Sequence, residues 1–222
     1  MNLTLFDLDG TLIPHDSDHA FGGFMVDVGW ADGEQWRRRN DEFYAEYQAG
    51  RLDLDAYIEF ATSAWRGRPL PQVLAMRERF MAEVMRPMLL PQAFELVQRH
   101  QRAGDLVAIV TATNEFVTAP IAQAFGVETL IAVNLERAAD GRYTGRVAGV
   151  PSFQAGKITR VQQWLAGLGR QWQDFERVHF YSDSINDLPL LERVSHPVAT
   201  NPTPALAAIA RERGWTELKL FA

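Results

Sequence analysis

The sequence contains no cysteine, which excludes disulfides, thiolate nucleophiles and zinc–thiolate sites. It has no apolar stretch long enough to span a bilayer. Its first residues also lack the basic segment followed by an apolar one that marks a signal peptide, so we expect a cytoplasmic protein. The net charge of −6 and the pI near 5.4 argue against binding to nucleic acid or to an anionic membrane.

The length and composition fit an ordinary globular protein with a large core. The chain has 222 residues, of which 47% are hydrophobic and 23% are charged. This length suits one sizeable domain, or a core domain that carries a smaller insertion.

Short apolar runs alternate with helical patterns over most of the chain. The runs that resemble strands buried on both faces are residues 3–8, 106–110, 130–133 and 178–181. The helical patterns between and after them are residues 92–103, 115–125, 157–166 and 204–213. This alternation predicts an α/β layer fold with a parallel sheet.

Residues 15–88 break the alternation, because they contain amphipathic helical stripes and no convincing strand. We therefore expect a core domain of residues 1–14 and 89–222, with residues 15–88 inserted as a small helical domain. A second local feature is Asp140-Gly141, which is flanked by strand-like segments at 134–137 and 142–147. An Asp-Gly turn in this setting predicts a small antiparallel hairpin.

The octet at residues 5–12, Leu-Phe-Asp-Leu-Asp-Gly-Thr-Leu, carries the strongest chemical signal. Asp7 and Asp9 stand two positions apart, so in extended backbone they project to the same side. Two close carboxylates repel each other unless a cation or a shared proton intervenes. The pair therefore indicates a magnesium-type site or a protonated acid. Taken alone, it is equally typical of a strand that ends in a polar turn.

Other polar residues follow other predicted strands. The second apolar run ends at Thr111, the fourth leads to Asp183, Asn186 and Asp187, and Lys157 lies near the start of a helix. Ligands of open parallel sheets bind beyond the carboxyl ends of the strands. The sequence thus predicts one crevice that holds carboxylates, a hydroxyl, an amide and an ammonium, which are the parts needed for metal-assisted phosphoryl transfer.

Four ordered motifs resemble those of the haloacid dehalogenase superfamily: Asp7-Leu8-Asp9-Gly10-Thr11-Leu12, Thr111, Lys157, and Ser182-Asp183 with Asn186-Asp187. A helical insertion directly after the first motif resembles the phosphoserine phosphatase-like subgroup. The resemblance implies a Rossmann-like three-layer core with an inserted helical cap. It also implies a Mg²⁺-dependent phosphatase whose partner is a small phosphorylated metabolite.

The resemblance further implies a role for each motif residue. Asp7 would be the nucleophile that forms an aspartyl-phosphate, and Asp9 would protonate the leaving alcohol and later activate water. Asp7, Asp183 and the backbone carbonyl of Asp9 would hold Mg²⁺, with Asp187 in support. The residues expected to hold the phosphate are Thr111, Lys157 and Asn186.

Substrate selectivity is expected to come from the cap. Asp16 aligns with a glutamate that phosphoserine phosphatases use near the substrate amine, so it either pairs with an ammonium group or caps the following helix. Relatives that act on phosphoserine also carry an arginine for the carboxylate in the segment matching residues 53–65, where this chain has no arginine or lysine. The resemblance therefore favours an amino-alcohol phosphate such as histidinol phosphate over phosphoserine.

Other readings stay open at this stage. A phosphotransferase would use the same residues, and a phosphoacceptor switch would also combine aspartate, threonine and lysine. The state of assembly is expected to be monomer or homodimer. The remaining unusual side chains are expected to serve packing or solvation, namely Trp30, Trp36, Tyr57 and Trp65, with His15, His19 and Arg37–Arg39.

Overall fold

A six-stranded parallel sheet forms the centre of the computed structural model, which describes residues 1–221. In spatial order its strands are β3 (Thr129–Val133), β2 (Leu106–Asn114), β1 (Leu3–Phe6), β6 (Val178–Ser182), β7 (His196–Thr200) and β8 (Thr216–Leu218). The four predicted strands are confirmed, although β2 extends four residues beyond its predicted end. Strands β7 and β8 were not predicted from the sequence.

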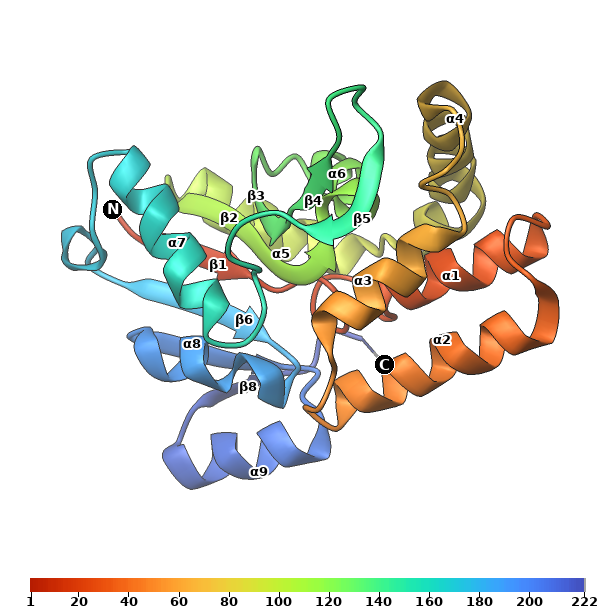
Figure 1. The fold of residues 1–222 in the computed structure, drawn as a ribbon. Coiled ribbons are helices and arrows are strands. Elements are labelled where there is room, and N and C mark those ends of the chain that lie inside the picture. The colour runs from red at the N-terminus through yellow and green to blue at the C-terminus, as the bar shows by residue number, and fades with distance from the viewer. Residues whose placement is uncertain (222) are drawn as a thin grey trace.

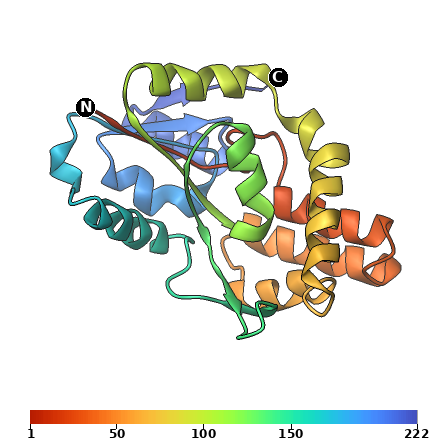
Figure 2. The same cartoon turned by 90° about the horizontal axis from the view of Figure 1, so that it is seen from above.

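Helices cover both faces of the sheet (Figures 1 and 2). Helices α5 (Pro91–Arg102) and α6 (Glu115–Ala124) lie on one face, and α7 (Gly156–Gly167), α8 (Leu188–Arg193) and α9 (Pro204–Arg213) lie on the other. The side chains of β1 point to both faces of the sheet. Leu3 and Leu5 pack with α7–α9, while Phe6 packs with α5 and α6. The predicted three-layer α/β architecture is therefore confirmed.

The segment between β1 and α5 is helical throughout. It comprises α1 (Ser17–Asp27), α2 (Gly33–Gln48), α3 (Leu54–Ser63), α4 (Leu70–Phe80), the π-helical η1 (Met81–Met85) and the 3₁₀-helical η2 (Arg86–Met88). These elements gather beside one end of the core in both views (Figures 1 and 2). They fall within residues 15–88, and we propose the division into core and cap that the sequence suggested.

The predicted hairpin is present as β4 (Leu135–Arg137) and β5 (Tyr143–Val147). It packs against α3 of the cap, where Tyr143 meets Trp65 edge-on at a ring distance of 5.1 Å. Gly145 has a φ of +87°, and a Cβ there would overlap the Arg66 guanidinium. A glycine is therefore needed where the hairpin contacts the cap.

Aromatic residues of the insertion mainly pack, as their spacing predicts. Trp65 is 2% exposed and stacks on Phe116 at 4.4 Å, and Trp36 stacks on Phe60 at 4.0 Å. Trp30 lies under the guanidinium of Arg68 at 4.2 Å.

The short 3₁₀ turns η3 (Trp172–Asp174) and η4 (Ile185–Asp187) complete the fold. Arg37, Arg38 and Arg39 lie on the exposed side of α2 in ion pairs with acidic neighbours, so they form a solvated face. Among residues 1–221, no helix combines the length and apolarity needed to cross a membrane.

Candidate active site

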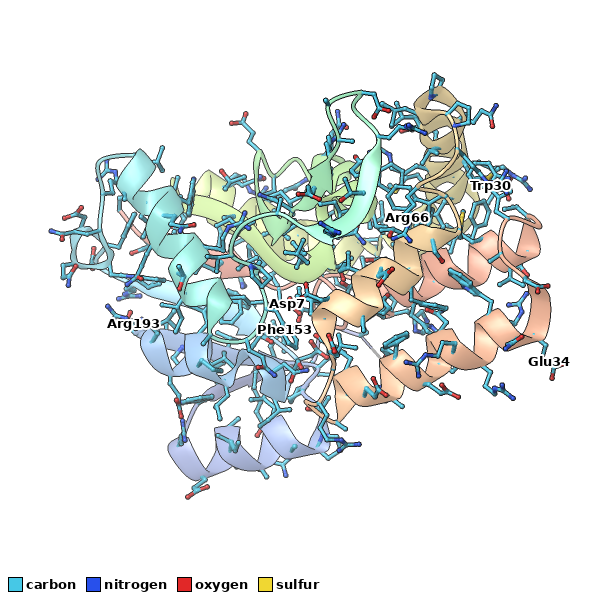
Figure 3. All side chains as sticks on the ribbon, viewed as in Figure 1. Asp7, Trp30, Glu34, Arg66, Phe153 and Arg193 are labelled. Atoms are coloured by element: carbon cyan, nitrogen blue, oxygen red, sulfur yellow. The ribbon has the colours of Figure 1, made fainter. Side chains whose placement is uncertain are left out.

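Strands β1, β2 and β6 end at the same edge of the sheet and bring the predicted motifs together. The Asp7 backbone N–H donates to the Tyr181 carbonyl at 2.9 Å, which fixes the end of β1 against β6. In Figure 3 the Asp7 side chain lies in the region where the core meets the cap. The site therefore forms where the parallel strands end, as expected for this sheet type.

A buried ammonium group organises the carboxylates. Lys157 is 1% exposed, and its Nζ lies 2.8 Å from Asp7 Oδ1 and 2.7 Å from Asp187 Oδ1. The Ser182 hydroxyl donates to Asp187 Oδ2 at 2.8 Å. Burial raises the pKa of Asp7 to about 7, although the Lys157 ammonium opposes that shift. Lys157 thus orients the Asp7 carboxylate and neutralises part of the local charge.

Asp183 is held on the other side of Asp7 by the first motif. The Thr11 hydroxyl lies 3.4 Å from Asp7 Oδ2 and 3.2 Å from Asp183 Oδ1, and it accepts from the Asp183 N–H at 3.1 Å. Gly10 has a φ of +74°, and a Cβ there would come within 2.3 Å of Asp183 Oδ2. Glycine is required because any side chain would displace this carboxylate.

The donor set fits Mg²⁺. Lys157 contacts Asp7 and Asp187 but not Asp183. Burial, together with the neighbouring Asp7 and Asp187 carboxylates, raises the pKa of Asp183 well above its ordinary value. Within residues 1–221 no three acidic or histidine side chains form a preassembled metal cage. Mg²⁺ needs no such cage, because it retains waters and takes one or two carboxylates together with substrate phosphate.

Asp9 lies near Asp7 and is held by two hydrogen bonds. Its Oδ1 accepts from the Ser17 backbone N–H at 2.6 Å, and its Oδ2 accepts from the Thr113 hydroxyl at 2.8 Å. Burial, reinforced by the nearby Asp16 carboxylate, raises the pKa of Asp9 to about 7. A carboxyl group poised near neutrality is suited to general acid–base work.

The predicted phosphate ligands are placed differently from one another. Thr111 is buried, and its hydroxyl accepts from the Thr113 N–H at 3.1 Å. Asn186 lies at the same edge of the sheet, but its amide donates to the backbone carbonyl of Tyr47 in the cap at 2.8 Å. In this conformation Asn186 therefore joins the core to the cap.

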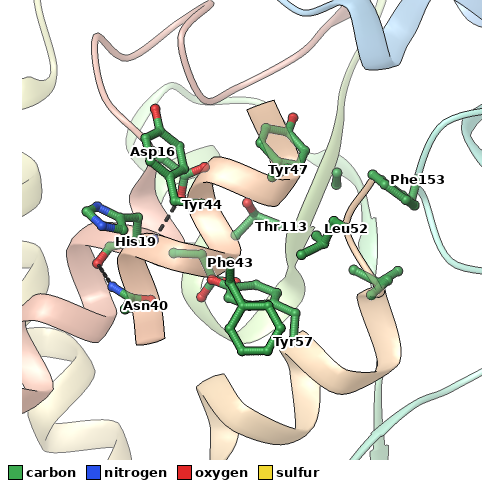
Figure 4. Close-up of a pocket in the computed structure, with 13 residues that line it drawn as sticks. Asp16, His19, Asn40, Phe43, Tyr44, Tyr47, Leu52, Tyr57, Thr113 and Phe153 are labelled. Carbon is green, nitrogen blue, oxygen red and sulfur yellow. Dashed lines mark hydrogen bonds between the residues drawn. The ribbon is translucent and has the colours of Figure 1, made fainter. Parts of the chain in front are cut away.

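Asp16 caps helix α1, since its Oδ1 accepts from the His19 N–H at 2.8 Å. It also lines a small cavity of about 30 Å³ between cap and core (Figure 4). The cavity is lined by Asp16, Asp18, His19, Asn40, Phe43, Tyr44, Tyr47, Leu52, Leu54, Tyr57, Ala112, Thr113 and Phe153. No arginine or lysine of residues 1–221 lines the cavity. Both proposed functions of Asp16, capping and facing a ligand, are compatible with this position.

Sequence reasoning missed several supporting residues. Thr11 lies inside the first motif and Thr113 lies two residues after Thr111, and their hydroxyls hold Asp183 and Asp9. Asn201 was not singled out, yet its amide donates to the Gly10 carbonyl at 3.0 Å. Asn201 directly follows β7, and a polar residue at the end of a strand would have been a candidate for the site. Strand β7 itself was not predicted from the sequence.

Comparisons with known proteins agree with the motifs. The family model for haloacid dehalogenase-like hydrolases matches residues 4–192. A histidinol-phosphatase from Neisseria meningitidis serogroup C (strain 8013) is 44% identical over 217 residues, which cover 98% of each chain. These findings confirm the predicted enzyme class, a phosphatase.

Solved structures show the same fold. A protein with unknown function from Bordetella pertussis Tohama I superposes with a TM-score of 0.94 at 50% identity, covering 99% of each chain. A substrate-bound phosphoserine phosphatase superposes with a TM-score of 0.69 at 18% identity, covering 98% of this chain and 92% of the other. The chain thus belongs to the haloacid dehalogenase-like hydrolase family, as its four motifs predict.

Proposed function

We propose that this protein is a Mg²⁺-dependent phosphomonoesterase that hydrolyses an amino-alcohol phosphate such as histidinol phosphate. The observation that carries the proposal is the cavity beside Asp9, which presents two carboxylates and several aromatic rings but no arginine or lysine of residues 1–221. The relative named a histidinol-phosphatase, 44% identical to this chain, supports the same substrate.

The geometry supports hydrolysis in two steps. In the first, Asp7 attacks phosphorus and the ester bond breaks, while Asp9 gives its proton to the leaving alkoxide. In the second, Asp9 takes a proton from water, which attacks the aspartyl-phosphate and restores Asp7. Lys157, 2.8 Å from Asp7 Oδ1, stabilises charge on the phosphoryl oxygens. A Mg²⁺ ion held by Asp7, Asp183 and the Asp9 carbonyl would reduce repulsion between the carboxylates and the phosphate.

The leaving group would extend from Asp9 into the cavity, since Thr113 both lines the cavity and donates to Asp9. A phosphoserine carboxylate there would meet Asp16 and Asp18 with no guanidinium to offset the repulsion. An ammonium group, by contrast, would be attracted by the same residues. The cavity thus favours an amino alcohol over an amino acid.

The cavity must widen for the leaving group to enter. Its volume of about 30 Å³ holds roughly two water molecules and no metabolite. The Asn186–Tyr47 hydrogen bond and the Tyr47–Phe153 ring contact at 6.4 Å join cap and core in this conformation. We propose that these contacts break on opening and that closure excludes water from the reaction.

A panel of phosphomonoesters tests the proposal, with phosphate release measured in Mg²⁺ and in chelator. The panel holds histidinol phosphate, phosphoserine, sugar phosphates and nucleotides, with Asp7→Asn as the inactive control. We expect metal-dependent turnover that favours histidinol phosphate. A preference for phosphoserine would contradict the substrate.

If none of the esters releases phosphate, the proposed hydrolase function fails, and a phosphotransferase or a phosphoacceptor switch becomes the better assignment. An Asp9→Asn variant separates a switch from a phosphatase. This change abolishes turnover in a phosphatase, whereas a switch would still be phosphorylated because it has no need of Asp9 as a proton donor.

A further inference from the structure

Asp18 is a buried carboxylate on the cap that the proposed chemistry does not use. It is 5% exposed and lines the small cavity. Its two oxygens accept from the Asn114 amide, each at 3.1 Å, and the Tyr57 hydroxyl lies near it. All of these partners are neutral. An ionised Asp18 would therefore be buried with no cation beside it to balance its charge.

The donors around Asp18 are fixed in orientation. Asn114 ends strand β2 and caps α6, with its Oδ1 accepting from the Val117 N–H at 3.2 Å. The Asn114 Nδ2 therefore has to point toward Asp18. Tyr57 comes from α3 and also lines the cavity. Three separate elements thus build a polar group beside the cavity, and burying a carboxylate there is costly unless a donor or a cation pairs with it.

Asp16 lies closer than Asp18 to the groove in which the phosphate would react. Asp16 lines both the small cavity and the wide solvent-open groove that contains Asp9 and Asp183. Asp18 lines only the small cavity. Asp16 therefore lies at the end of the cavity nearest the reacting phosphate, and Asp18 lies further along the path of the leaving group.

This order matches the order of groups in an amino-alcohol phosphate that carries a nitrogen heterocycle. In histidinol phosphate the amine is on the carbon next to the ester carbon, and the ring follows one carbon later. We propose that Asp18, supported by Tyr57 and Asn114, selects the substrate by accepting a hydrogen bond from a ring N–H, while Asp16 pairs with the amine. This inference rests on the proposed function and adds a second recognition point to it.

The aromatic walls of the cavity fit the same ligand. Phe43, Tyr44 and Phe153 line it beside Tyr57 (Figure 4), and such side chains pack on the faces of a flat ring. Burial also raises the pKa of Asp18 to about 7. A cationic or N–H-bearing ring would pair with the carboxylate and offset part of that cost.

A matched pair of substrates tests the role of Asp18. Phenylalaninol phosphate keeps the amine and a flat ring of histidinol phosphate but lacks the ring N–H. Because a buried acceptor left unpaired is costly, we expect the wild type to prefer histidinol phosphate by about 100-fold or more in kcat/KM. In Asp18→Asn this preference should fall to about 3-fold or less, chiefly through loss of histidinol phosphate turnover.

Two further variants control the result. Tyr57→Phe keeps the ring that packs in the cap and should also reduce the preference, which covers the case that Asp18→Asn does not fold. Asp16→Asn should lower kcat/KM for both esters by similar factors and leave their ratio unchanged.

The two possible failures are distinguishable. If wild-type enzyme turns over histidinol phosphate but both Asp18→Asn and Tyr57→Phe keep its preference, the role of Asp18 is refuted and the proposed function stands. If the wild type turns over neither ester, the proposed function fails, and this inference fails with it.

Discussion

Replacement of Lys157 by methionine is expected to destabilise the metal-free protein strongly. The ammonium lies 2.8 Å from Asp7 Oδ1 and 2.7 Å from Asp187 Oδ1, and all three side chains are at most 4% exposed. Removing one partner from a buried ion pair costs about 3–5 kcal/mol, because the remaining charge is left unpaired. In a chain of this length each kcal/mol corresponds to about 2–4 °C, so we expect the melting temperature to fall by roughly 6–20 °C.

The assay is calorimetric unfolding in chelator, with Lys219→Met as the control. Lys219 is the only other lysine of the chain, and it is exposed at the groove that contains Asp9 and Asp183. Its replacement removes the same charge without touching Asp7 or Asp187. We also expect kcat of Lys157→Met to fall by about 10²–10³-fold, as when one fixed electrostatic group is lost. A melting temperature within about 2 °C of the control would refute the claim that Lys157 compensates the buried carboxylates.

Two further substitutions test contacts around the site. Asn201→Ala removes the donor to the Gly10 carbonyl and the acceptor for the Leu220 and Phe221 N–H groups, and it adds no charge beside the acidic site. The Mg²⁺ dissociation constant measured by calorimetry should therefore rise by about 3–10-fold, and an unchanged constant would show that Asn201 does not position the first motif. Trp65→Ala removes the ring stacked on Phe116 and should cost about 3–5 kcal/mol in urea unfolding. A loss below about 1 kcal/mol would contradict the anchoring of the cap by Trp65.

The candidate catalytic cluster could be predicted because each of its residues lies beside or within an element with a clear local pattern. Asp7 and Asp183 come directly after apolar strands, and Lys157 is the second residue of α7, after Gly156. The parallel sheet then brings these positions to one edge, irrespective of the conformation of the connecting loops. Chain pattern and sheet geometry were therefore sufficient for this part of the site.

Asn201 was not predicted because its strand has a weak signal. The segment His196–Thr200 is short, begins His-Pro, and pairs as a strand only once β6 is in place beside it. Asn201 itself adopts a φ of +45°, a turn conformation that a single sequence does not reveal. Its contact with Gly10 joins positions 191 residues apart.

The cavity also lay beyond the sequence pattern. Asp18 falls in the first turn of α1, where an acidic residue is ordinarily an exposed partner of the helix dipole. It is buried only because Asn114 and Tyr57, from two other elements, close around it. Likewise, the Asn186 contact with Tyr47 depends on how the cap closes.

Rapid acid quenching of the wild-type enzyme during turnover, followed by peptide mass spectrometry, would show whether Asp7 carries the phosphoryl group. The reaction would contain Mg²⁺ and histidinol phosphate, with Asp7→Asn treated in parallel. We expect a transient phosphoryl adduct on the peptide that contains Asp7, and none in the variant. An adduct on another residue, or full turnover by Asp7→Asn, would contradict the proposed chemistry.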